Sequence, residues 1–289
     1  MTDENAIIIQ AWNTVLFEKF TRFRYLLTHG LSGHSDEAFR RQPMERGSKV
    51  LDVGCGFGDT SLRIAEMVGP SGHVTGVDCA EKFVESARTD ARVAQVDNVT
   101  FELGDVQFSD LGGPYAHAFS RFGTMFFNSP GAALRNIRRA LGPGGQLTMI
   151  VWRKREDNPW LHEAELCVRA LVPVVSHEDA GQVHCGPGPF SMSGPDMVSD
   201  MLQGSGFGRV RFERFDTEIC IGRNLDEAVE FATALGPAGE ILRLAGAAAE
   251  KSQDAVADAL RSVLGQFQRG DGSGVWAPSS TWFVHAYAP

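Results

Sequence analysis

Three glycines at alternate positions follow a short apolar run near residue 50. Residues 50–53 are typical of a buried β-strand, Gly54, Gly56 and Gly58 come next, and a helix-type run occupies 60–68. Glycine lets the backbone turn sharply and lets a ligand approach the main chain with no Cβ in the way. A strand, glycine loop and helix in this order bring a ligand to a helix N-terminus at the carboxyl edge of a parallel sheet.

An acidic residue closes the next apolar run. Asp78 follows residues 74–77 and lies twenty residues beyond Gly58. A carboxylate at the end of a second strand can accept two hydrogen bonds from a ribose diol. The two segments together predict a ligand that contains a nucleoside.

The glycine spacing bears on which nucleotide binds. A dinucleotide site has the pattern Gly-x-Gly-x-x-Gly, and here Asp59 stands where the third of those glycines would be. The phosphate-loop pattern is absent as well. A nicotinamide oxidoreductase is therefore the less favoured of the alternatives.

Alternating apolar runs predict the elements that position these residues. The expected strands are 49–53, 73–77, 99–103, 116–120 and 146–152, and the expected helices between them are 60–68, 81–94 and 132–141. Parallel strands joined by helical crossovers form a doubly wound sheet. Residues 142–145, Gly-Pro-Gly-Gly, predict a tight turn before the fifth strand.

The segments on either side of this core are less regular. We expect helices at 5–29, around 38–44 and at 158–172, an irregular stretch at 173–195, helices at 195–204, 225–235 and 240–267, and strands at 209–221 and 280–288. The late strands bring the total to seven, and they can pair antiparallel only if residues 223–275 fold outside the sheet. Aromatic residues of the first helix could line a pocket, although such a stripe is more often core: Trp12, Phe17, Phe20, Phe23 and Tyr25.

Composition limits the function classes. The chain has 289 residues, 43% hydrophobic and 22% charged, with a net charge of −9, which disfavours a nucleic-acid partner. The five cysteines are scattered and form no Cys-x-x-Cys pair, so a reducing compartment is expected. No apolar run is long enough to cross a bilayer, and the first residues are acidic, so we expect a cytoplasmic protein without membrane insertion.

Four segments in order resemble a known family. Residues 50–58 are similar to the first motif of class I S-adenosylmethionine-dependent methyltransferases, and 74–78, with Glu81 and Arg88 after them, are similar to the second. Residues 101–106 resemble the third, and 134–145 resemble the segment that leads into the fifth strand. Outer segments resemble a bacterial small-molecule group related to ubiquinone and menaquinone methyltransferases: 119–127, 158–160, 188–191 and 282–286.

The resemblance implies an α/β Rossmann-like sheet of seven strands, mostly parallel with an antiparallel last strand. It also implies four parts of the chain. These are a helical N-terminal cap segment (1–47), a cofactor-binding core (48–155), an acceptor-side cap (156–208) and the C-terminal part of the core (209–289). The acceptor pocket is expected from residues 8–45, 121–127 and 152–200.

Residue roles follow from the same resemblance. The cofactor is S-adenosyl-L-methionine, with S-adenosyl-L-homocysteine as product. Asp52 is expected to place the amino group, Asp78 to bind the ribose hydroxyls, and Asp105 to bind the adenine amine. The full expected set is Asp52, Gly54, Cys55, Gly56, Gly58, Asp78, Cys79, Gly104, Asp105, Val106, Ser120, Arg121 and Phe122.

Catalytic candidates are few, because the protein mainly has to align donor and nucleophile. Arg121 could bind an acidic group of the acceptor, with a structural ion pair as an equal alternative. An oxygen acceptor would need a base, and His162 is the candidate among His34, His117, His162, His177 and His184. The spacing of His162, Cys167, His177, His184 and Cys185 matches no compact zinc site, so no metal is expected.

The sequence thus predicts an enzyme that moves a methyl group, by in-line displacement, to an oxygen, nitrogen or carbon atom of a small organic acceptor. One alternative is a protein of the same fold that binds the cofactor but serves as a scaffold or rearrangement catalyst. Tyr115-Ala116-His117 motivates it, since an acidic residue is more usual at the start of this strand. The acceptor stays open, as does the oligomeric state, for which a homodimer is one alternative.

Overall fold

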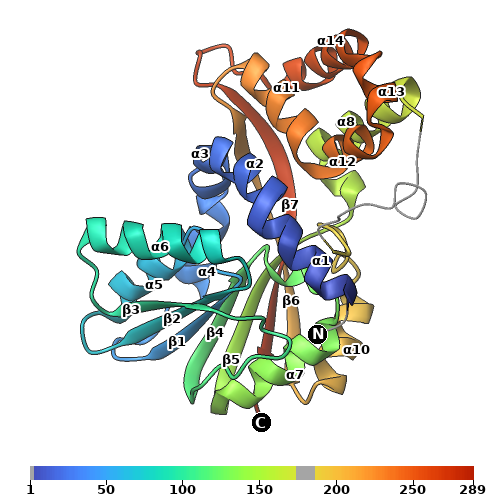
Figure 1. Cartoon of the computed structure of the whole chain (residues 1–289). Coiled ribbons are helices and arrows are strands. Elements are labelled where there is room, and N and C mark those ends of the chain that lie inside the picture. The colour runs from blue at the N-terminus through green and yellow to red at the C-terminus, as the bar shows by residue number, and fades with distance from the viewer. Residues whose placement is uncertain (1–2, 174–185) are drawn as a thin grey trace.

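Seven strands form one twisted sheet in the computed structural model, which describes residues 3–173 and 186–289 (Figure 1). Their order is β3-β2-β1-β4-β5-β7-β6. β1 to β5 are parallel, and β7 lies antiparallel between β5 and β6. The bounds are β1 Lys49–Val53, β2 His73–Asp78, β3 Val99–Leu103, β4 Tyr115–Arg121, β5 Leu141–Trp152, β6 Gly208–Gly222 and β7 Val275–Tyr287.

Successive side chains of a strand face opposite sides of the sheet, and both sides are covered. Val50 packs in a cluster with residues of α4 (Ser32–Arg41), α5 (Asp59–Val68) and α6 (Glu81–Ala94). Leu51 and Val53 belong to the larger cluster of the other face, with α7 (Pro130–Ala140) and α10 (Pro195–Gly204). The chain reverses its strand order between β1 and β4, which is where α/β sheets bind ligands.

Two further groups of helices lie at the carboxyl edge of the sheet (Figure 1). The N-terminal segment comprises α1 (Asp3–Ala11), a π-helical turn (Trp12–Leu16), α2 (Phe17–Arg22) and α3 (Arg24–Thr28). The helical cap comprises α8 (Pro159–Leu171), α11 (Leu225–Ala234), α12 (Gly236–Ala245), α13 (Ala247–Glu250) and α14 (Gln253–Leu264). Within the cap, α8 packs against α12 and α14. Short 3₁₀ turns lie at Thr124–Phe126, Arg155–Asp157 and Gly265–Phe267.

The fold class and the strand count are confirmed, with an antiparallel last strand and residues 223–274 outside the sheet. Several local predictions were wrong. Residues 5–29 are not one helix, because aromatic side chains on this segment contact different partners: Phe17 packs on Phe57, and Phe23 on Phe231. Residues 240–267 are likewise divided, since Gly246 ends α12 with a φ of 50°.

Two predicted boundaries also move. Residues 142–145 belong to β5 rather than to a separate turn, because the backbone of Gly144 and Gly145 bonds to Ala288 beyond β7. The helix expected around 38–44 begins at Ser32 and ends at Arg41, before Pro43, as the restricted residue ahead of a proline favours. Of the residues expected to be irregular, 174–185 lie outside the described part of the chain.

In the described parts of the chain, no helix combines the length and the apolar character needed to span a membrane.

Candidate cofactor and acceptor site

The glycine loop turns directly from β1 into α5. Gly58 precedes α5 with a left-handed backbone (φ 80°), and a Cβ there would lie 2.7 Å from the ring of Phe101 and 2.9 Å from Cβ of Ala87. Gly56 also has a positive φ of 53°, but a Cβ there would meet no atom within 4 Å. Gly58 is thus required by packing, whereas the space beside Gly56 is open to a ligand.

Asp78 ends β2 and holds the loop in place. Its Oδ2 accepts the backbone N–H of Gly56 at 2.9 Å, and its Oδ1 accepts the N–H of Ala80 at 3.0 Å. Burial raises the pKa of Asp78, and the hydrogen bonds from the backbone act in the opposite direction. Each oxygen of the carboxylate keeps acceptor capacity, since one carboxylate offers about four lone-pair sites.

Asp52 lies behind the loop and is 1% exposed. Thr60 and Ser61 donate their hydroxyl groups to Oδ2 at 2.7 and 2.6 Å, while Oδ1 is buried without a hydrogen-bond partner. Burial raises the pKa of Asp52 to about 6, and the two hydroxyl groups only partly offset this effect. Oδ1 of Asp52 is therefore a buried hydrogen-bond acceptor to which no described group of the protein donates.

Asp105 is engaged by residues that the sequence did not single out. Asn5 of α1 donates to Oδ2 at 2.7 Å, and Gln107 donates its backbone N–H and its side-chain amide to Oδ1 at 2.9 and 3.0 Å. Gln107 also donates to Oδ1 of Asn5 at 2.9 Å. The N-terminal helix is thereby joined to the turn after β3. Nothing in the local pattern indicated this contact, because Asn5 and Asp105 are 100 residues apart.

Aromatic side chains of the N-terminal segment cover the glycine loop. Phe17 contacts Phe57 and Phe83 at centroid distances of 6.3 and 5.0 Å, and Trp12 and Phe20 also pack against Phe83. Trp12 and Phe20 line the cavity described next, as the sequence suggested for this stripe. Tyr25 is instead 52% exposed.

One cavity of about 1180 Å³ extends from the glycine loop to the helical cap. Ligand pockets for single small molecules measure about 300–1,000 Å³, so this cavity has room for more than one. Ten of the predicted cofactor residues line it: Gly54, Cys55, Gly56, Asp78, Cys79, Gly104, Asp105, Val106, Arg121 and Phe122. The other three, Asp52, Gly58 and Ser120, lie behind its wall; Ser120 donates its hydroxyl to the carbonyl of Val53 at 2.8 Å.

Arg121 lines the cavity as a member of an ion pair. Its Nη2 lies 2.6 Å from Oδ2 of Asp59 at the start of α5, and its Nη1 donates to Ser35 at 3.2 Å. The side chain is 9% exposed. The structural ion pair, one of the two alternatives for this residue, is thus present in the molecule.

His162 is not brought to the cavity. It lies on α8 with its Nδ1 buried and without a hydrogen-bond partner, and it is absent from the lining. No histidine or tyrosine occurs among the lining residues within 3–173 and 186–289. His34 is buried between Phe122, Trp152 and Phe215, and burial lowers its pKa to about 3.

The cysteines and histidines form no metal centre in the portion of the chain that is described. His177, His184 and Cys185 lie outside the described residues. Cys55 and Cys79 line the cavity, and burial raises the pKa of both thiols. Both are therefore uncharged at neutral pH.

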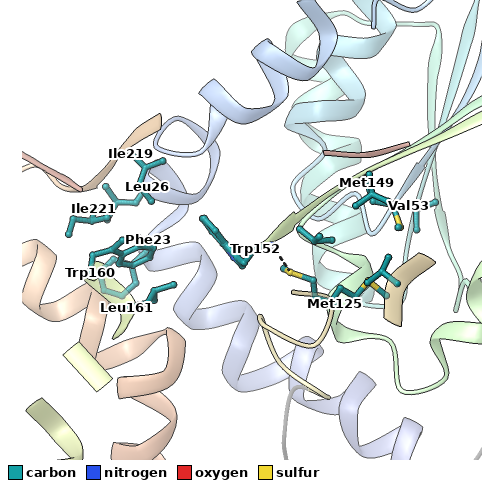
Figure 2. Close-up of a cluster of buried hydrophobic side chains, with 14 of the residues drawn as sticks. Phe23, Leu26, Val53, Met125, Met149, Trp152, Trp160, Leu161, Ile219 and Ile221 are labelled. Atoms are coloured by element: carbon teal, nitrogen blue, oxygen red, sulfur yellow. Dashed lines mark hydrogen bonds between the residues drawn. The ribbon is translucent and has the colours of Figure 1, made fainter. Parts of the chain in front are cut away.

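The far part of the cavity is built by the helical cap and by the neighbouring core. Figure 2 shows Trp152 between a group with Phe23, Leu26 and Trp160 and a group with Val53, Met125 and Met149. Trp152 stacks on Phe122, with the ring centroids 4.3 Å apart. Lining residues also come from α11 and α12, which the sequence had not assigned to the pocket: Phe231, Ala234, Gly236, Pro237, Glu240, Ile241, Arg243 and Leu244.

The family comparison agrees with this geometry. A model described as "Methyltransferase domain" matches residues 44–172, which contain the glycine loop, Asp78 and Asp105. Together with the sheet order, this match shows that the chain carries a class I S-adenosylmethionine-dependent methyltransferase domain, and that the protein is an enzyme of the EC 2.1.1 class that uses this cofactor. The nicotinamide alternative is thereby set aside.

Particular relatives are distant. The demethylmenaquinone methyltransferase of Listeria welshimeri is 29% identical over 185 residues, which are 61% of this chain and 77% of that protein. That of Staphylococcus aureus strain JH9 is 25% identical over 216 residues, 69% of this chain and 86% of that protein. The structure of a putative methyltransferase from Bacillus halodurans has a TM-score of 0.56 at 16% identity, covering 88% of this chain and 98% of that one.

A second solved structure is also similar in fold. The phosphoethanolamine N-methyltransferase 2 of Haemonchus contortus, in complex with S-adenosyl-L-methionine, has a TM-score of 0.57 at 16% identity. It covers 98% of this chain and 60% of that one. At such identities the two structural likenesses bear on the fold alone.

The residues present fit the cofactor. An orphaned carboxylate oxygen on Asp52 can accept from a cationic amino group through a bound water or by a small adjustment. The open space beside Gly56 allows close approach to the main chain.

Proposed function

We propose that this enzyme methylates a small, largely apolar organic molecule that binds beneath the helical cap. The observation that carries the proposal is the continuous cavity of about 1180 Å³ that joins the glycine loop to Trp160 and Phe231. Its size supports simultaneous binding of the cofactor and an acceptor.

The proposed cofactor contacts use residues that line or support the near part of the cavity. Asp78 binds the ribose hydroxyl groups, Asp105 the adenine amine, and Asp52 the amino group, while Gly54 and Gly56 admit the ligand to the backbone. S-adenosyl-L-methionine, when bound, supplies an electrophilic methyl group on a sulfonium. The remaining work of the chain is to align the acceptor and to exclude water.

The acceptor is proposed to need no strong base from the enzyme. The described lining contains no histidine or tyrosine, and Asp59 is already paired with Arg121. This supports an acceptor whose attacking oxygen, nitrogen or carbon atom is nucleophilic at neutral pH, such as an ionised phenol or a stabilised carbanion. Arg121 enters as the residue that holds the start of α5 beside the cavity, and His162 has no part.

The similarity to the curated relatives mainly supports the use of S-adenosyl-L-methionine as methyl donor. Their name, demethylmenaquinone methyltransferase, gives demethylmenaquinone as the acceptor of those proteins. The aromatic lining around Trp12, Phe126 and Trp160 supports a flat apolar acceptor here too. The four-part division at residues 47, 155 and 208 remains a proposal. α11 and α12 add to the acceptor side of that division.

Calorimetry with S-adenosyl-L-homocysteine tests the donor half. We expect micromolar-range binding to the intact protein and its loss in Asp78→Ala, because the ribose loses its acceptor. Arg261→Gln is the matched control, since Arg261 pairs with Asp226 and Asp258 away from the cavity. Absence of binding by the intact protein would refute the proposal. Transfer of a labelled methyl group to extracted metabolites then tests the acceptor half.

A further inference from the structure

The far wall of the cavity carries two arginines on one buried carboxylate. Arg155 precedes α8, while Glu165 and Arg169 lie on it, and all three line the cavity. Nη1 of Arg155 donates to both oxygens of Glu165 at 2.6 Å, and Arg169 donates from Nε and Nη2 at 2.9 and 2.7 Å.

Burial differs sharply within this cluster. The Glu165 side chain is 4% exposed, whereas those of Arg155 and Arg169 are 40% and 42% exposed. Glu165 therefore serves as the fixed anchor, and the two guanidinium groups are the part that a ligand can reach. The Arg155 guanidinium is further held over the ring of Phe190, at 5.4 Å.

The charges of the cluster do not cancel. Among the described residues, two guanidinium groups face one carboxylate, which leaves one positive charge in excess. The neighbouring ion pair on α12 contributes one charge of each sign, with Nε of Arg243 2.8 Å from Oε2 of Glu240. Nε and Nη2 of Arg155 donate no hydrogen bond to the described residues, so the cluster also has donors to spare.

Apart from Glu240 and Arg243, the described side chains beside the cluster are mostly apolar. The rings of Trp160 and Phe231 stack with their centroids 5.9 Å apart and an interplanar angle of 10°, and Leu161, Leu235 and Ile241 also line this part of the cavity. The indole Nε1 of Trp160 is enclosed in the wall and has no hydrogen-bond partner. A complementary ligand would be apolar over most of its length and rich in acceptors at one end.

We propose that the acceptor is an organic acid: an apolar, ring-containing molecule whose anionic group binds Arg155 and Arg169, with the methylated atom toward the glycine loop. Planar guanidinium groups match a carboxylate with paired hydrogen bonds, which favours this anion. The inference rests on the proposed function, because it assigns the acceptor of the same cavity.

The test compares two probes with the same ring system, 2-naphthoate and 2-naphthamide, titrated into the full chain saturated with S-adenosyl-L-homocysteine. The first carries a carboxylate, and the second carries an uncharged amide of similar size and shape. We expect the acid to bind at least about tenfold more tightly than the amide, as a charge-assisted pair allows. In Arg155→Gln and in Arg169→Gln this preference falls to about twofold or less, because one substitution cancels the excess charge. Arg261→Gln keeps the preference.

A triple variant guards against misfolding. Arg155→Gln/Glu165→Gln/Arg169→Gln removes all three charges and leaves no unpaired buried ion, and it should bind the two probes equally. Equal binding of acid and amide by the unmodified protein overturns the inference, as does failure of both to bind or a preference that survives in the triple variant. If only S-adenosyl-L-homocysteine fails to bind, the result contradicts the cofactor assignment and not the binding of an organic acid. Failure of the proposed function and failure of this inference are therefore distinguishable.

Discussion

Asp52 carries a buried oxygen atom, Oδ1, that has no hydrogen-bond partner among the described residues, and we propose that the ligand satisfies it. The carboxyl group accepts two hydroxyl groups on Oδ2 and none on Oδ1, and burial raises its pKa to about 6. The folded protein therefore has a greater preference for the neutral form than an exposed aspartate has. A cation placed beside Oδ1 would reverse this preference, because an opposite charge favours the ionised form.

Ligand binding should release a proton near pH 6. If Asp52 is half protonated in the free protein and ionised beside the ligand's amino group, S-adenosyl-L-homocysteine would displace about half a proton. Calorimetry in buffers of different ionisation enthalpy measures this number. Asp52→Asn should reduce it to nearly zero at pH 6, whereas unchanged proton release in this variant would exclude Asp52 from the amino-group site.

The same shift has a consequence for stability. The folded pKa is raised above the unfolded value, so the contribution of Asp52 is fully present below about pH 4 and is lost as the pH rises through about 6. Asp52→Asn should therefore flatten the decline in unfolding free energy of the ligand-free protein between pH 4 and 7. Urea titrations at several pH values measure that slope, and an unaltered slope would contradict the assignment.

At the scale of elements, Gly56 and Gly58 separate ligand access from packing. Gly58→Ala should lower the free energy of unfolding by about 2–5 kcal/mol, because it adds a clash with Phe101 to an unfavourable backbone. Gly56→Ala should cost only about 1–2 kcal/mol, since its Cβ meets open space.

Ligand affinity should rank the two variants in reverse. Gly56→Ala is expected to weaken binding of S-adenosyl-L-homocysteine at least about tenfold, because the methyl group occupies space near the loop. The folded fraction of the Gly58→Ala variant should lose less affinity for S-adenosyl-L-homocysteine. Urea unfolding and calorimetry on the same samples provide both numbers, and equal effects in the two variants would refute the distinction.

The elements with strong local periodicity were predictable from sequence. The predicted bounds of strands 49–53 and 99–103 and of helix 81–94 agree with the structure to the residue. Each segment has a clear local pattern: an apolar run in the first strand, alternation at the start of the second, and helical spacing of apolar residues in 81–94. The division of 5–29 was not predictable, since it depends on Phe57 and Phe231, which are distant in sequence.

The residues of the site likewise differ in how far they could be predicted from local sequence. Most predicted cofactor residues line the cavity because each follows directly from its own strand or loop. The far wall of the cavity was only partly predicted: Phe231 and Ile241 reach it through the packing of α11 and α12 against neighbouring elements. No short pattern records such a contact, so tertiary structure alone revealed it.

At the scale of the whole molecule, three parts of the chain line the cavity: the N-terminal segment, the core around the sheet and the helical cap. A bound ligand should therefore stabilise the three parts together. At a ligand concentration of about 100 times Kd, S-adenosyl-L-homocysteine should raise the unfolding free energy by about 2.7 kcal/mol. The urea dependence should stay unchanged, because the same surface is exposed on unfolding. Asp78→Ala should show no increase, and an equal increase in this variant would contradict specific binding.

The position of β7 has a further consequence, for the order of folding. β7 lies between β5 and β6 in the sheet. In the sequence, however, the cap helices, α10 and β6 separate Trp152 at the end of β5 from Val275 at the start of β7. The parallel strands β1 to β5 can associate through nearby crossovers, whereas β6 gains its place in the sheet only when β7 arrives. Closing so long a loop is slow. The half of the sheet that carries the cofactor loop is therefore expected to form first, with two strand edges open until the last strand enters.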